Sequence, residues 1–142
     1  MLIENELYDK IREVLPTVCV DLLVTNQQGQ YLLAKRTEKP AKGSWWFPGG
    51  RIHKGETWEE CAKRKGKEEL GIDVELDDKI MCVHHTYSHF TMEMHMFWAR
   101  IQSGEPRAIE CRHFKWIALK DIRSLPFSKA DLKVIDAITE AD

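Results

Sequence analysis

The sequence predicts an α+β fold in which a mixed β-sheet lies between helices, an α/β/α arrangement. Three observations lead to this prediction. Apolar and β-branched runs of strand length recur along the chain and are separated by polar turns. Apolar residues at helical spacing mark both ends of the chain, and a charged helix interrupts the strands. The third is length: 142 residues suffice for one hydrophobic core, so we expect residues 1–142 to form a single domain.

Residues 1–15 are predicted to contain a short amphipathic helix that ends before Pro16. Its apolar side chains recur at helical spacing over residues 3–14, and they are Ile3, Leu7, Ile11 and Val14. We expect this helix to cover one end of the core. A contact in a homodimer is the alternative role of the same face.

The segment 17–25 is apolar and rich in β-branched residues, which predicts a buried strand. Asp21 interrupts this strand, and a carboxylate is costly to bury without a partner. A polar turn at 26–30 leads to a second strand at 31–36, so we expect a hairpin. A loop at 37–44 follows.

A short aromatic strand at 45–48 runs into two adjacent glycines, and a charged helix follows them. The second half of the chain is predicted to consist mainly of strands, at 72–76, 80–87, 90–101 and 114–118, with an acidic turn at 77–78 between the first two. A helical turn at 121–124 and an amphipathic helix at 129–139 end the chain, the latter with Leu132, Ile135 and Ile138 inward.

Composition excludes several classes of function. The net charge of −2 and the lack of a long basic tract argue against a nucleic-acid polymer as ligand. No apolar run approaches the length that spans a membrane, so we expect no membrane partner. The four cysteines form no C-x-x-C pair, which is typical of reduced thiols in a cytoplasmic protein.

The stretch 49–72 carries the residues best suited to chemistry. On its helix, Arg64, Glu68 and Glu69 lie at i, i+4 and i+5 and therefore cluster. Glu69 also shares a stripe with Trp58, Ala62 and Lys65, of which Trp58 and Ala62, with Cys61 at the edge, are expected against the core. An inward carboxylate needs a cation, and Mg²⁺ or Mn²⁺ with oxygen ligands is the natural candidate. An ordinary surface ion pair between Arg64 and Glu68 is the alternative.

This stretch resembles the Nudix box, G-x5-E-x7-R-E-U-x-E-E-x-G-U, in which U is a bulky apolar residue. The matching residues are Gly50, Glu56, Arg64, Glu68, Glu69, Gly71 and Ile72. The resemblance implies a Mg²⁺-dependent hydrolase that cleaves a nucleoside diphosphate linked to another moiety. It also implies that the Gly50 carbonyl, Glu68 and Glu69 hold the metal, that Arg64 orients carboxylates or phosphate, and that Glu56 braces the loop.

Two positions depart from the family pattern. Lys65 stands where the family has a glutamate, and Gly66 stands where it has an apolar residue. Our hypothesis is that the Lys65 ammonium neutralises the place where a second metal would bind. The alternative is a surface lysine that this position merely tolerates. A glycine inside a helix costs about 1 kcal/mol relative to alanine, so we expect another part of the chain to approach Gly66 closely.

A narrower resemblance covers residues 35–57, which are similar to the corresponding part of GDP-mannose mannosyl hydrolases. That subfamily uses one Mg²⁺ and substitutes at the sugar carbon. The likeness implies that Arg36 and Arg51 bind the phosphates, for which guanidinium groups are well suited, and that Asp21 matches an acidic residue of the first strand.

The sequence offers two candidates for the residue that activates water, Glu110 and His85. Glu110 lies six residues before Trp116, where many Nudix enzymes carry an acidic residue that binds metal or acts as base. Mannosyl hydrolases place a catalytic histidine next to it, whereas this chain has Cys111. Among the histidines, which are His84, His85, His89, His95 and His113, we consider only His85 as a substrate or base contact. Their spacings match no compact zinc motif.

Three functions remain open at this stage. The first is hydrolysis of a GDP-sugar. The second is a nucleoside triphosphate pyrophosphohydrolase of the MutT kind, which the residues 116–129 also resemble, and the third is a module that binds nucleotides without turning them over. Trp45, Trp46, Tyr87, Phe90 and Trp98 either stack on a base or belong to the core.

Overall fold

The computed structural model describes residues 4–36 and 43–140. Ile3 and most of the loop expected at 37–44 lie outside these residues. The described part contains three α-helices, seven strands and one 3₁₀-helix: α1 (Asn5–Val14), β1 (Thr17–Val24), β2 (Gln30–Lys35), β3 (Trp45–Trp46), β4 (Gly49–Arg51), α2 (Trp58–Leu70), β5 (Asp73–Thr86), β6 (Thr91–Ser103), β7 (Phe114–Ala118), η1 (Leu119–Ser124) and α3 (Lys129–Glu140). None of these helices is long and apolar enough to cross a membrane.

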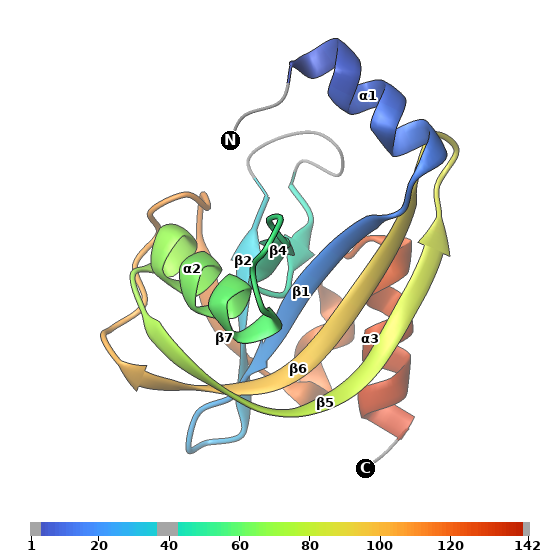
Figure 1. Ribbon diagram of the computed structural model, residues 1–142. Helices are drawn as coiled ribbons and strands as arrows, with labels where there is room; N and C mark the ends of the chain where they lie inside the picture. Colours follow the sequence, from blue (N-terminus) through green and yellow to red (C-terminus); the bar gives the residue numbers. More distant parts are fainter. Residues whose placement is uncertain (1–3, 37–42, 141–142) are drawn as a thin grey trace.

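The strands form two sheets (Figure 1). The larger sheet is mixed and has the order β4-β1-β6-β5, with β1 and β6 parallel and the other neighbours antiparallel. The smaller sheet is antiparallel, in the order β3-β2-β7. Helices α2 and α3 lie on opposite sides of the larger sheet, which confirms the predicted α+β class with a mixed sheet between helices.

Alternation along β1 separates the two halves of the core. Val20, Leu22 and Val24 pack toward α2, together with Cys61 and Leu70. Cys19 and Leu23 face the opposite side, where α3 contributes Val134, Ile135 and Ile138. Asp21 falls between Cys19 and Leu23 in this alternation, so its side chain belongs to the α3 side of the sheet.

Two predictions about strands need correction, and one strand was not predicted. The hairpin between 17–25 and 31–36 exists only at its tip, through the bridge Thr25↔Tyr31, because β1 and β2 then diverge into different sheets. The acidic turn at 77–78 is absent: β5 continues through it, with register shifts between Leu76 and Met81. The two glycines after the aromatic run begin β4, a strand that was not predicted and that pairs with β1.

The helices also differ from prediction in detail. In α1, Leu7 and Val14 are 52% and 77% exposed, so this helix does not cover the core. Trp58 was expected in the core but is 37% exposed. It is the first residue of α2, and its ring packs against His95 of β6. Leu132 is exposed as well, since the inward stripe of α3 runs through Asp131, Val134, Ile135 and Ile138.

Candidate active site

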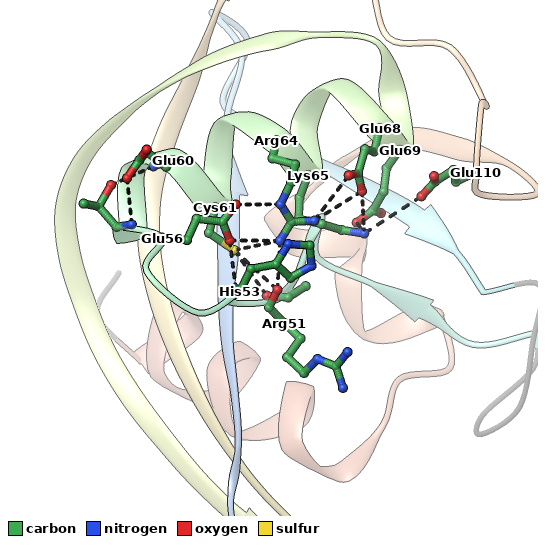
Figure 2. A network of polar contacts seen from close by, with 12 residues as sticks. Arg51, His53, Glu56, Glu60, Cys61, Arg64, Lys65, Glu68, Glu69 and Glu110 are labelled. Carbon is green, nitrogen blue, oxygen red and sulfur yellow. Dashed lines mark hydrogen bonds and ion pairs between the residues drawn. The ribbon is translucent and has the colours of Figure 1, made fainter. Parts of the chain in front are cut away.

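The loop before α2 and the helix itself are held together by Arg64 (Figure 2). Its Nε donates to Glu56 Oε2 over 2.7 Å, and its Nη2 donates to the carbonyl oxygen of Arg51 over 2.9 Å. Glu56 in turn accepts from the backbone N–H of His53 at 2.9 Å. The hydrogen bond from Arg64 lowers the pKa of Glu56 to about 2. The geometry is that of a loop braced by Glu56 and Arg64.

Helix α2 begins and ends with strong local signals. Thr57 forms a capping box with Glu60, and Gly71 ends the helix in the left-handed conformation at φ 66°. The predicted close approach to Gly66 is confirmed: a Cβ there would lie 3.2 Å from the carbonyl oxygen of Ile72. The chain after Gly71 therefore folds back tightly against α2.

Three carboxylates surround the ammonium of Lys65 (Figure 2). Its Nζ lies 3.5 Å from Glu68 Oε2, 3.6 Å from Glu69 Oε1 and 3.9 Å from Glu110 Oε2. Glu110 is far away in sequence, and the backbone places it here. The N–H groups of Ile109 and Glu110 both donate to the carbonyl oxygen of Glu69, at 3.1 and 3.3 Å.

Glu69 is the buried member of this carboxylate cluster, with 2% of its surface exposed. Its Oε1 accepts from the Gly49 N–H at 3.3 Å, whereas its Oε2 has no hydrogen-bond partner among the described residues. Burial raises the pKa of Glu69 to about 7, and the neighbouring Glu110 adds to the shift, against the opposing effect of Lys65. An unpartnered carboxylate oxygen inside the protein is the feature that a bound cation would satisfy.

The groups around Glu69 suit a hard divalent cation. They are carboxylate oxygens, together with the carbonyl oxygen of Gly50, a residue that pairs with β1 and whose carbonyl oxygen lies 3.7 Å from the Cys61 thiol. Lys65 passes directly over Gly50, where a Cβ would lie 2.6 Å from the lysine Cε. The fixed ammonium thus shares the space in which a metal would be held.

A cavity of about 440 Å³ adjoins this cluster on the α3 side of the sheet. Its apolar walls come from side chains of several elements and the loops beside them, namely Trp45, Trp46, Phe47, Tyr87, Phe90, Met92 and Met94. Of the aromatic residues considered for stacking, Trp98 is elsewhere and packs against Tyr31. The other four line the cavity, so they are available to an aromatic ligand.

Two carboxyl groups, Asp21 and Asp131, also line this cavity. Burial raises the pKa of Asp131 to about 7. It raises the pKa of Asp21 as well, and the nearby charges of Asp131 and Glu69 add to that shift. Asp131 was not among the residues predicted from the sequence, although its position three and four residues before Val134 and Ile135 is the signal that places it inward.

Arg36 connects the cavity with the carboxylates. It lines the large cavity and also a smaller one of about 140 Å³ that includes Lys65, Glu69 and Glu110. Its guanidinium lies 4.2 Å above the Trp46 ring. A ligand with an aromatic part in the cavity and a charged part at the carboxylates would pass this guanidinium.

Two predicted site residues lie apart from the cluster. The Arg51 guanidinium points away from the carboxylates (Figure 2) and lies 4.5 Å from the Tyr8 ring of α1. His85 packs edge-on against Tyr87, at 4.5 Å between ring centroids, and is not among the residues that line the cavity. The contact expected of His85 with substrate or water therefore has no support in this geometry.

Two known proteins are similar to this chain over about two thirds of its length. The low-salt glycan biosynthesis protein Agl8 of Haloferax volcanii is 34% identical over 91 residues, which are 64% of this chain and 58% of that protein. A putative 8-oxo-dGTP diphosphatase of Bacillus subtilis is 35% identical over 99 residues, which are 68% of this chain and 63% of that protein. The matched region thus spans less than two thirds of either relative.

The fold has close counterparts among solved structures. The MutT NUDIX hydrolase from Burkholderia pseudomallei superimposes with a TM-score of 0.79 at 29% identity, over 86% of this chain and 97% of that one. The family model described as NUDIX domain matches residues 20–137, which include most of β1, the whole stretch 49–72 and most of α3. The chain therefore belongs to the NUDIX domain family.

Proposed function

We propose that this chain is a divalent-metal-dependent hydrolase of a nucleoside diphosphate linked to another moiety, and that its substrate is a GDP-sugar of the GDP-mannose kind. The observation that carries the proposal is the buried Oε2 of Glu69, which has no hydrogen-bond partner among the described residues. It lies beside an aromatic cavity, and Arg36 lines both this cavity and the smaller one that includes Glu69. The resemblance of residues 35–57 to mannosyl hydrolases supports the sugar nucleotide.

In this proposal Glu69, Glu68, Glu110 and the Gly50 carbonyl hold Mg²⁺ or Mn²⁺. The metal supplies positive charge to the diphosphate and lowers the pKa of water. Arg36 binds phosphate oxygens from the cavity side, and Arg51 has to turn from Tyr8 to do the same. Arg64 keeps Glu68 in place, since its Nη1 lies 3.3 Å from both oxygens of that carboxylate.

Glu110 is our candidate for the group that takes a proton from water. Its side chain is 53% exposed and lies at the edge of the cluster, where a water molecule can reach it. Cys111 is a poor base by comparison. Burial and the charge of Glu69 raise the pKa of its thiol, and its Sγ points to the carbonyl oxygen of Glu69 at 3.9 Å.

A second candidate is a nucleoside triphosphate pyrophosphohydrolase. The 8-oxo-dGTP diphosphatase among the relatives favours it, and three carboxylates around one point suit attack at phosphorus equally well. A nucleotide-binding module without turnover is the third, and Lys65 inside the metal position is the observation in its favour. All three place the nucleotide in the same cavity.

The four free cysteines fit a cytoplasmic location for any of these three functions.

The experiment that separates these functions is a panel of nucleotide sugars and nucleoside triphosphates, incubated with Mg²⁺ in ¹⁸O-labelled water. We expect turnover of a GDP-sugar with the label in the released sugar. Label in phosphate would contradict attack at carbon and favour the pyrophosphohydrolase. Tight nucleotide binding without any turnover would leave only the binding module.

Glu69→Gln tests the proposed metal site directly. We expect a loss of activity of about a hundredfold or more, because removing a metal ligand costs more than the 10–100-fold seen for residues that only support ligands. Glu59→Gln is the matched control, since Glu59 is exposed on the same helix and pairs with Lys63 at 3.0 Å. Equal activity of the two variants would refute the assignment of Glu69.

A further inference from the structure

A second group of candidate metal ligands lies on β5 and β6 of the larger sheet, away from the carboxylate cluster around Lys65. In the antiparallel pair of β5 and β6, Cys82 is directly opposite His95, and His84 is directly opposite Glu93. The two members on each strand are two residues apart, so all four side chains lie on one face of the sheet. None of them has a part in the proposed function.

The distances within this group are those of a site that one ion would fill. His95 Nε2 and His84 Nε2 each lie 2.9 Å from an oxygen of Glu93, and Cys82 Sγ lies 3.9 Å from His95 Nε2. The ligand atoms of Cys82, Glu93 and His95 all lie within 4.8 Å of one another. Zinc bonds of about 2.0–2.3 Å in a tetrahedron put ligand atoms roughly 3.3–3.8 Å apart, so only small side-chain movements are needed.

His95 is held in place by its surroundings. It is 8% exposed and packs under Trp58, with ring centroids 4.0 Å apart. A buried imidazole whose ring is fixed by packing loses little freedom when it binds an ion. Cys82 is half-buried, and Glu93 and His84 open toward solvent, which leaves a route for the ion.

Lys79 determines which nitrogen of His95 carries the proton when no metal is bound. Its Nζ lies 2.7 Å from His95 Nδ1, and an ammonium can only donate, so Nδ1 accepts and the ring proton is on Nε2. Binding of a metal at Nε2 moves this proton to Nδ1, releases the thiol proton to solvent and displaces the ammonium. Lys79 is exposed and also lies 4.1 Å from the Trp58 ring, so it can leave Nδ1 without losing every contact.

We propose that this group binds one Zn²⁺ ion, with Cys82, Glu93 and His95 as ligands and His84 in the fourth position. The mixture of sulfur, nitrogen and oxygen donors is typical of zinc and unsuited to Mg²⁺. Strand β5 is an edge strand of its sheet, so the ion ties this edge to β6. The antiparallel pairing brings Cys82-x-His84 and Glu93-x-His95 together. Their spacing along the chain does not predict this proximity.

The test is a Co²⁺ titration in the presence of excess Mg²⁺, followed by competition with Zn²⁺. Excess Mg²⁺ is expected to fill the carboxylates around Lys65, in line with the proposed function, and thiolate-to-cobalt absorption reports only a site that contains a cysteine. We expect one equivalent of Co²⁺ with this absorption in the native chain. Cys82→Ser should abolish it, and His84→Ala should weaken binding about tenfold, whereas His113→Ala, an exposed histidine elsewhere, should change nothing.

Lys79→Gln provides the sharpest readout, because it should strengthen binding at least several-fold. The variant removes the ammonium that competes for His95 and leaves an amide oxygen that can accept from Nδ1–H. Misfolding cannot produce this gain. Absence of thiolate absorption in both the native chain and Lys79→Gln would overturn the proposal. Absorption that persists in Cys82→Ser would do the same, since it would point to another thiol such as Cys111.

Discussion

Lys65 puts a fixed positive charge among the carboxylates that are proposed to hold the metal. Because its ammonium lies within 3.9 Å of Glu68, Glu69 and Glu110, it competes with divalent cations for the same oxygens. We expect Lys65→Met to bind the first Mn²⁺ about tenfold more tightly and Lys65→Glu to gain a second ion. Calorimetric titration with Mn²⁺ gives both the affinity and the number of ions.

The control for Lys65 is Lys67→Met on the same helix, because Lys67 is exposed and pairs with Asp73 at 3.1 Å, outside the cluster. If all three variants bind Mn²⁺ with the affinity and stoichiometry of the native chain, the ammonium has no influence on the metal.

Asp131 should make stability depend on pH in an unusual direction. Its pKa of about 7 in the folded chain exceeds the ordinary value of 3.8, because burial disfavours the ionised form. A raised carboxyl pKa costs stability as pH rises from about 4 through 7. Asp131→Asn should therefore be more stable than the native chain by about 1–3 kcal/mol at pH 8, with little advantage at pH 4.

Urea unfolding at both pH values, without added metal, measures this difference for Asp131. Asp136→Asn is the companion variant, since Asp136 is exposed on the same helix and pairs with Arg123 at 2.8 Å. A stability difference at Asp131 that does not change with pH would show that the carboxyl keeps an ordinary pKa.

Single residues were predictable where one periodicity or one gapped pattern fixes them. Glu69 shares a helical stripe with buried Ala62, so its inward position follows from sequence alone. The location of Lys65 between Glu68 and Glu69 follows from the same angle. Asp131 was missed because an acidic residue at the start of a helix usually stays in solvent, and only the packing of α3 against the sheet encloses it.

At the level of elements, β4 depends on the close approach of Gly49 to β1. Gly49 has a φ of 151°, and a Cβ at this position would overlap Asp21 Oδ1 and the carbonyl oxygen of Val20. We expect Gly49→Ala to destabilise the chain by about 2–4 kcal/mol, since β4 has to separate from β1. Thermal or urea unfolding measures the loss.

Gly29→Ala is the control that distinguishes the cost of steric overlap at Gly49 from the cost of a positive φ. Gly29 also has a positive φ, 75°, but nothing lies within 4 Å of a Cβ there. We expect it to cost only about 1 kcal/mol. Equal losses in the two variants would mean that close strand pairing adds nothing at Gly49.

Elements with their own local signal were predicted well, and elements defined by distant partners were not. Thr57, Glu60 and Gly71 mark both ends of α2 in the sequence. By contrast, the run of β5 through Asp77 and Asp78 depends on pairing with β6, where Arg100 contacts Asp77 at 3.4 Å. A propensity for turns cannot anticipate such a partner.

For the whole molecule, an apolar surface is exposed on α1 and the residue that follows it. Leu7, Val14 and Leu15 are each more than half exposed. We propose that a second copy covers this face, so sedimentation velocity should show a dimer at micromolar concentration and a monomer for Val14→Glu. Leu132→Glu, at an exposed position of α3, should remain dimeric. A monomeric native chain at all concentrations would rule the dimer out.

The arrangement of layers followed from the order of predicted strands and helices, but the division into two sheets did not. Strands β1 and β2 are neighbours in sequence, yet they belong to different sheets. The cavity could not be foreseen for the same reason. Its walls come from β1, β3, β4, the connection between β5 and β6, β6 itself and the start of α3, and only the folded chain brings these segments to one place.

The carbonyl oxygen of Glu69 has a consequence for how this fold tolerates change. Since it receives the N–H groups of both Ile109 and Glu110, while Leu70 receives that of Arg107, the spacing of the acidic side chains is set by α2 itself. The exposed connection around Glu105 therefore does not determine where these acidic side chains lie. Extra residues grafted there should leave Glu110 in place, which makes this connection a natural attachment point for labels or additional specificity loops.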